Sequence, residues 1–145
     1  MTVDPELVTR KLMLIASDVD ALRPIAAKGL DAYVGDRVDQ AVVERYLERA
    51  IGRMIDVNFH LITGTGQPPP TDYHASFLRL ADLQVLDAGF ARQIARAAGL
   101  RNRLVHEYDE VNPERVFEGL EAALRDVPVY LAGVNAYLSR SADLG

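Results

Sequence analysis

Two side chains in the segment from residue 101 to 108 have the chemistry needed to cleave RNA. Arg101 carries a guanidinium that stays protonated at any working pH, and His106 carries an imidazole that exchanges protons near neutral pH. RNA cleavage needs a base for the ribose 2′ proton, an acid for the departing 5′ oxygen, and a cation for the charge that accumulates on the phosphate. These two residue types can supply all three without a metal ion.

The spacing of these residues shows that one chain offers only part of such a site. On a straight helix, Arg101 and His106 are about 140° apart around the axis and about 7.5 Å apart along it. Asn102 lies four residues before His106, within about 40° of it, so its amide can orient the imidazole or bond the same phosphate. A two-fold dimer that places this helix against its copy would bring both sets of residues into one cleft.

A purely structural role for Arg101 is the alternative. The apolar row that precedes it on the expected helix consists of Phe90, Ile94 and Ala97. A guanidinium that continues such a row is costly to bury without a partner for its donors. A buried ion pair between Arg101 and either Asp56 or Glu48 would meet that need.

The pattern Arg101, His106 and Tyr108 matches the Arg-x4-His-x-Tyr signature of the HepT-type toxins in the HEPN superfamily, and Asn102 also fits. The chain resembles this family over nearly its whole length, including the runs at residues 43–51, 55–62 and 111–116. It departs from the family at Glu107, where many relatives carry a small residue. The Glu107 carboxylate either faces solvent or raises the pKa of His106.

The resemblance implies a homodimeric, metal-independent endoribonuclease toxin with no cofactor, acting on transfer RNA or messenger RNA. Arg101 and His106 of both subunits would cleave the RNA, and Asn102 would shape the site. It also implies an MntA-like antitoxin, a minimal nucleotidyltransferase that transfers AMP from ATP to Tyr108. Added AMP would place bulk and negative charge where an RNA phosphate binds. The alternative for Tyr108 is a structural role, in which its side chain completes the apolar row of the motif helix. The alternative function is a non-catalytic nucleotide-binding or adaptor module on the same fold.

Apolar residues recur at helical spacing along the chain, and no segment alternates as a strand would. We therefore expect an all-α, HEPN-like antiparallel bundle of about five helices. Residues 29–36 are predicted to form a turn. The first expected helix begins at Asp4-Pro5 and is either kinked or ended by Pro24, and the second covers 43–61. The third follows Asp72, the fourth runs from Asp87 towards Tyr108, and the fifth runs from Asn112-Pro113 through a kink at Pro128.

Length and composition predict one domain spanning residues 1–145. The balance of 49% hydrophobic and 26% charged residues is typical of a globular protein, and without cysteine neither disulfides nor thiolate metal sites can form. The first residues lack the features of a secretion signal, and no apolar run approaches the roughly 20 residues that cross a membrane. We therefore expect a cytoplasmic protein without membrane contact.

A net charge of −5 argues against a general binder of polyanions, so any RNA site must be local. No acidic residue separates Asp87 from Glu107, whereas four arginines lie there: Arg92, Arg96, Arg101 and Arg103. Arg96 and Arg103 are candidate RNA contacts, unless they belong to an ordinary solvated face.

Two further groups of polar residues are candidates for the site. Asp56 and Asn58 would join the cleft if their helix packs beside the motif helix, unless they are polar residues of a helix interface. The histidines His60, His74 and His106 do not share the spacing of metal ligands. We therefore predict no metal site.

Overall fold

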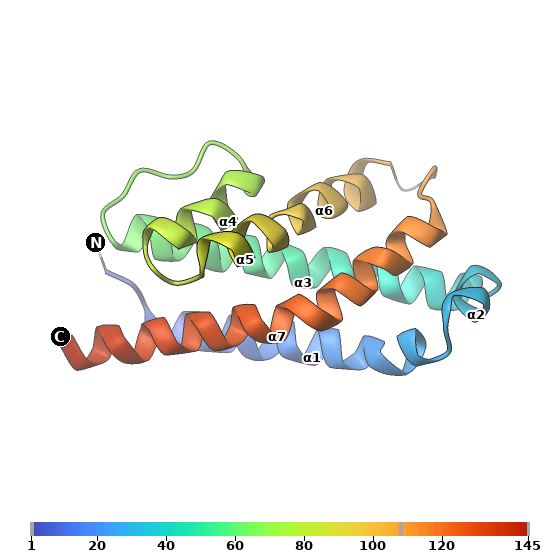
Figure 1. Ribbon diagram of the computed structural model, residues 1–145, viewed down its shortest axis with the longest axis horizontal. Coiled ribbons are helices and arrows are strands. Elements are labelled where there is room, and N and C mark those ends of the chain that lie inside the picture. The colour runs from blue at the N-terminus through green and yellow to red at the C-terminus, as the bar shows by residue number, and fades with distance from the viewer. Residues whose placement is uncertain (1, 108, 145) are drawn as a thin grey trace.

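The computed structural model describes residues 2–107 and 109–144, the last two by their backbone alone. The regular structure in this part of the chain is all helical, with no strand, and Figure 1 shows the order of the helices. They are α1 (Pro5–Ala27), α2 (Leu30–Val34), α3 (Arg37–Gly64), α4 (Tyr73–Asp82), α5 (Ala88–Ile94), α6 (Arg96–His106) and α7 (Pro113–Leu144). None of these helices is long and apolar enough to cross a membrane.

Aspartates precede four of the helices, and three of these caps, Asp4, Asp72 and Asp87, were predicted from the sequence. The first backbone N–H groups of a helix have no partner inside it, and a carboxylate just before the helix can accept them. Side chains in this position accept a bond from a first-turn N–H at Asp4, Asp36, Asp72 and Asp87. At the start of α7, the Asn112 side chain accepts from the N–H of Arg115 at 3.1 Å. These caps set the residue at which each of these helices begins.

The first turn region differs in part from the prediction. α1 runs through Pro24 to Ala27, which excludes the alternative that this proline ends the helix. The segment predicted as a turn contains the short helix α2, which begins after Gly29 with φ of 91°. Tyr33 of α2 is buried, and its ring packs on that of Phe117 at 5.4 Å between centroids. This distant contact stabilises α2.

The helix expected from Asp87 towards Tyr108 is divided into α5 and α6. At the junction, Ala95 is fully buried, and its carbonyl accepts from the N–H of Ala98, three residues ahead. This tighter 3₁₀-type bond interrupts the regular helix and lets α6 take its own direction. Together with α2, the division explains why seven segments occur where about five helices were expected.

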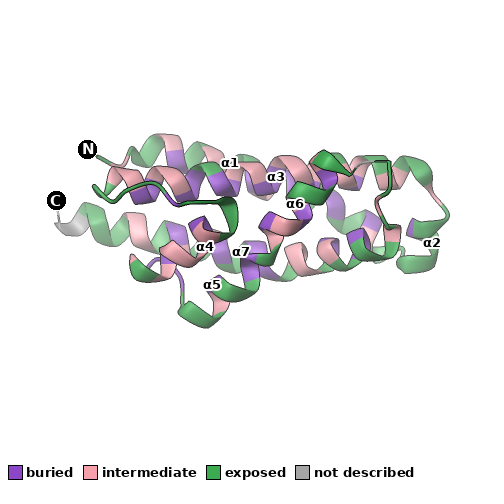
Figure 2. Cartoon of the chain, turned by 90° about the horizontal axis from the view of Figure 1, so that it is seen from above, coloured by how far each residue is buried: buried purple, intermediate pink, exposed green. Residues whose placement is uncertain are grey.

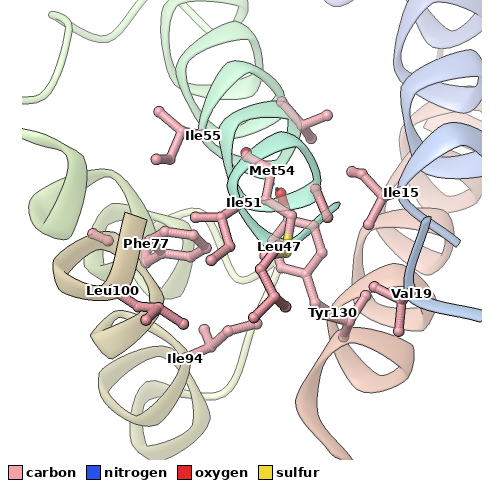
Figure 3. Close-up of a cluster of buried hydrophobic side chains, with 14 of the residues drawn as sticks. Ile15, Val19, Leu47, Ile51, Met54, Ile55, Phe77, Ile94, Leu100 and Tyr130 are labelled. Carbon is pink, nitrogen blue, oxygen red and sulfur yellow. Dashed lines mark hydrogen bonds between the residues drawn. The ribbon is translucent and has the colours of Figure 1, made fainter. Parts of the chain in front are cut away.

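The long helices α1, α3 and α7 run side by side, and α4, α5 and α6 lie across α3 from α1 (Figure 1). α7 continues through Pro128 and bends along its length, as expected for a proline inside a helix. Figure 2 shows the buried residues on the facing sides of these helices. In Figure 3, α3 lies at the centre of the core, through Leu47, Ile51, Met54 and Ile55. α3 therefore packs against α1 and α7 on one side and against α4 and α6 on the other.

A polar network lies inside this apolar core. The side chain of Asn58 is 0% exposed, and its Nδ2 donates to Oγ of Ser76 at 3.0 Å. The Tyr130 hydroxyl donates to Asn58 Oδ1 at 2.6 Å and also lies 3.1 Å from the carbonyl of Met54. Because buried polar groups need partners, the network specifies how α3, α4 and α7 meet.

Removing one member of this network should destabilise the bundle. Tyr130→Phe leaves Asn58 Oδ1 without its donor, so we expect the free energy of unfolding to fall by about 1–3 kcal/mol. Urea denaturation followed by circular dichroism measures this change. Tyr137→Phe on the same helix is the matched control and should stay within about 0.5 kcal/mol of wild type. If the two variants were equally stable, the network would contribute nothing.

Candidate active site

The helix α6 carries the motif and is held to the bundle by one face. Leu100 and Leu104 are buried, while Asn102 and His106 are exposed on the rest of the helix. On α7, a Cβ added to Gly119 would lie 2.5 Å from a methyl carbon of Leu100. The absence of a side chain at this glycine lets α6 approach α7 closely.

Arg101 lies on the side of α6 that faces α3 and α4. It is half-buried, and its Cζ lies 5.2 Å from the centre of the Tyr73 ring, a cation–π contact. Its Nε is buried and has no hydrogen-bond partner among the described residues. A buried donor without a partner is rare in folded proteins, so the guanidinium of Arg101 is not fully satisfied by the described residues.

The structure does not support the ion pair considered as an alternative for Arg101. In the described part of the chain, Arg101 makes no salt bridge. The carboxylate of Asp56 pairs with Lys11 at 3.4 Å, and that of Glu48 pairs with Arg45 at 3.6 Å. Both carboxylates thus have other cations, and the charge of Arg101 remains available to a ligand.

A cleft of about 540 Å³ opens beside Arg101, between α3, α4 and α6. Its walls include two further arginines, Arg49 and Arg53, which the sequence analysis missed. Both bind the carboxylate of Asp18, whose side chain is only 6% exposed. The hydrogen bond to Asp18 raises the pKa of Arg49. Their i,i+4 spacing on α3 was the one signal in the sequence that could have identified them.

The structure of one chain separates Arg101 from His106. His106 is the exposed last residue of α6 and does not line the cleft that Arg101 lines. This agrees with the angle expected from their spacing on a helix. Glu107 follows as an exposed residue, which favours the solvent-facing alternative. Tyr108 lies outside the described residues.

The secondary candidates fall in three different places. Asp56 is exposed and lines the Arg101 cleft. Arg96 and Arg103 are exposed too, but they line a groove between α6 and α7, on another side of α6. Asn58 belongs to the core network and is fully buried, so in this fold it cannot contact RNA. The interpretation of Asn58 as a polar residue of a helix interface is the correct one.

Of the other two histidines, one has a structural partner. His60 Nε2 accepts the backbone N–H of Asp4 at 2.9 Å, which ties the N-terminal segment to α3. His74 is exposed on α4. Within residues 2–107 and 109–144, no three His, Asp or Glu side chains come close enough to hold a metal ion together.

Residues 15–133 match a family model described as Ribonuclease HepT-like. The tRNA nuclease HepT of Aphanizomenon flos-aquae (strain 2012/KM1/D3) is 34% identical over 136 residues, which cover 94% of this chain and 92% of that protein. The matched region contains the cleft, α6 and the complete Arg-x4-His-x-Tyr pattern.

Solved structures share the fold at lower sequence identity. The cytosolic protein of unknown function YutE from Bacillus subtilis has a TM-score of 0.84 at 14% identity, covering 96% of this chain and 93% of its own. The tri-AMPylated HEPN toxin of Shewanella oneidensis, in complex with an MNT antitoxin, has a TM-score of 0.79 at 22% identity, covering 89% and 96%. The all-α bundle is confirmed, and the family match shows that this chain belongs to the HepT-like ribonucleases.

Proposed function

We propose that this chain is the RNA-cleaving toxin of a toxin–antitoxin pair and that Arg101 and His106 perform the reaction. The observation that carries the proposal is Arg101 itself, a half-buried guanidinium that lines a cleft and has no carboxylate partner among the described residues. A phosphate of RNA supplies the acceptor oxygens that this guanidinium lacks. Family membership supports the same reaction.

The proposed reaction breaks one P–O bond and forms another. One imidazole removes the ribose 2′ proton, and the 2′ oxygen attacks the adjacent phosphorus. The bond from phosphorus to the 5′ oxygen breaks, and a protonated imidazole gives that oxygen its proton. Arg101 stabilises the charge on the phosphate oxygens during the attack. The products are a 2′,3′-cyclic phosphate and a 5′-hydroxyl.

Two copies of the chain are proposed to share the active cleft. A single chain places Arg101 in a cleft that excludes His106, and a two-fold axis near the exposed side of α6 would provide both an acid and a base. Light scattering during size-exclusion chromatography should therefore give the mass of a dimer. Full activity at concentrations where the protein is monomeric would contradict the shared cleft.

The substrate test uses purified chain, expressed without a partner, in EDTA. Because the relative from Aphanizomenon flos-aquae is named a tRNA nuclease, transfer RNA is the first substrate and messenger RNA the second. We expect cleavage to persist in EDTA. Nucleotide binding with no cleavage of either RNA would instead favour the non-catalytic module.

We further propose that an MNT-type antitoxin silences the chain by transferring AMP to Tyr108, as the AMPylated HEPN toxin of Shewanella oneidensis suggests. Incubation with such a nucleotidyltransferase and ATP should add whole AMP masses to Tyr108 and abolish cleavage, because negative charge then occupies the phosphate site. Peptide mass spectrometry locates the modification. Tyr108→Phe should remain unmodified; AMP on another residue of this variant would refute the assignment.

A further inference from the structure

We propose that the cleft between α3, α4 and α6 is a nucleotide subsite, in which the base of a nucleotide next to the scissile phosphate packs against the Tyr73 ring. This inference rests on the proposed function and adds a binding residue that the motif does not contain. Tyr73 is the first residue of α4, placed there by the cap at Asp72, and 39% of its surface is exposed. Part of the Tyr73 side chain is therefore accessible to a ligand in the cleft.

The cleft contains both aromatic rings, which can contact a base, and a guanidinium, which can bind a phosphate. Tyr73 and Phe59 meet edge to face, with centroids 6.2 Å apart, and both line the cleft. Any base can stack on such rings because every base has a π face. Arg101 lies over the Tyr73 ring, so the cation for the phosphate and the surface for the base adjoin each other.

The charge around the cleft also fits an RNA strand. Arg49, Arg53 and Arg101 line it, while Asp18 lies behind the first two and fixes their side chains. The lining carboxylates, Glu48 and Asp56, are each paired with another cation. The lining residues themselves include three arginines and two carboxylates, in a chain whose net charge is −5. The local excess of positive charge favours a phosphodiester over an uncharged ligand.

The size of the cleft suits one nucleotide. Its volume of about 540 Å³ lies within the range of small-ligand sites, roughly 300–1,000 Å³. The subsite can therefore accept a single unpaired nucleotide beside the cut.

The first test measures binding to an oligoribonucleotide that covers the mapped cut and carries 2′-O-methyl groups, which block attack by the 2′ oxygen. Tyr73→Ala should weaken binding roughly 5- to 150-fold, the range expected for loss of one stacked base, and should raise the KM for cleavage by a similar factor. Tyr73→Phe keeps the ring and should bind within about threefold of wild type. The matched control is Tyr137→Ala, which removes a ring next to Arg140 on α7, outside the cleft, and should leave binding unchanged.

A second probe separates stacking from an indirect effect on Arg101. Wild-type protein should lose the same factor of affinity when one nucleotide beside the cut is made abasic, whereas Tyr73→Ala should not distinguish the abasic probe from the intact one. Wild-type-like binding by Tyr73→Ala, or equal sensitivity of both proteins to the abasic nucleotide, overturns the subsite and leaves the proposed function intact. A wild-type chain that neither binds nor cleaves RNA overturns both.

Discussion

Replacing His106 with alanine is expected to lower the rate of RNA cleavage by about 10²- to 10⁴-fold, the usual contribution of a positioned general acid or base. The side chain is exposed at the last position of α6, so its loss removes no core packing. Cleavage rates in EDTA, together with thermal unfolding of both proteins, measure the two effects separately. The melting temperature should hardly change, whereas the rate of RNA cleavage should fall by the factor given above.

The matched control for this variant is His74→Ala, which removes an exposed histidine on α4 that is not part of the motif. Its cleavage rate should equal that of wild type. If His106→Ala retained more than a tenth of wild-type activity, proton transfer by this imidazole would no longer be a tenable step.

Arg101→Ala should lower the cleavage rate by about 10²- to 10³-fold, the effect of removing one group that stabilises developing charge. Arg101→Lys should recover only part of this loss, because an ammonium lacks the planar fork that bonds two phosphate oxygens. Arg10→Ala, at an exposed site on α1, is the control and should be fully active. Single-turnover cleavage of a labelled RNA measures all three.

The stability of Arg101→Ala distinguishes a ligand-binding arginine from a structural one. Removing one partner of a buried ion pair costs about 3–5 kcal/mol. No such pair occurs at Arg101 among the residues that the structure describes, so we expect the free energy of unfolding to change by less than about 1 kcal/mol. A variant that unfolds easily but retains its specific activity when folded would show that the guanidinium serves the fold.

The sequence predicted the helical bundle because the signals for it are local. Caps such as Asp4 and Asp87 lie beside the backbone groups that they satisfy, and apolar rows repeat within each helix. What it missed depends on distant contacts: α2 depends on Tyr33 meeting Phe117. The break at Ala95 lies in a run of ordinary helix formers, so it left no local sign.

Part of the candidate site could also be predicted from local sequence signals, and part depends on contacts between distant segments. Residue chemistry and the resemblance to the family signature predicted Arg101, Asn102 and His106, and helical spacing correctly placed the arginine and the histidine on different sides of α6. The remainder of the cleft comes from α3 and α4, through residues such as Arg53 and Tyr73 that are far from α6 in sequence. Only the packing of the three helices brings these side chains together.

The chemistry of the RNA ends tests the central claim most directly. Purified wild-type chain in EDTA should leave a 2′,3′-cyclic phosphate on the upstream fragment and a 5′-hydroxyl on the downstream fragment, and it should not cut where the ribose carries a 2′-O-methyl group. Fragments with 5′-phosphate ends, or cleavage at the methylated ribose, would show that the 2′ oxygen is not the nucleophile and would contradict the roles assigned to Arg101 and His106.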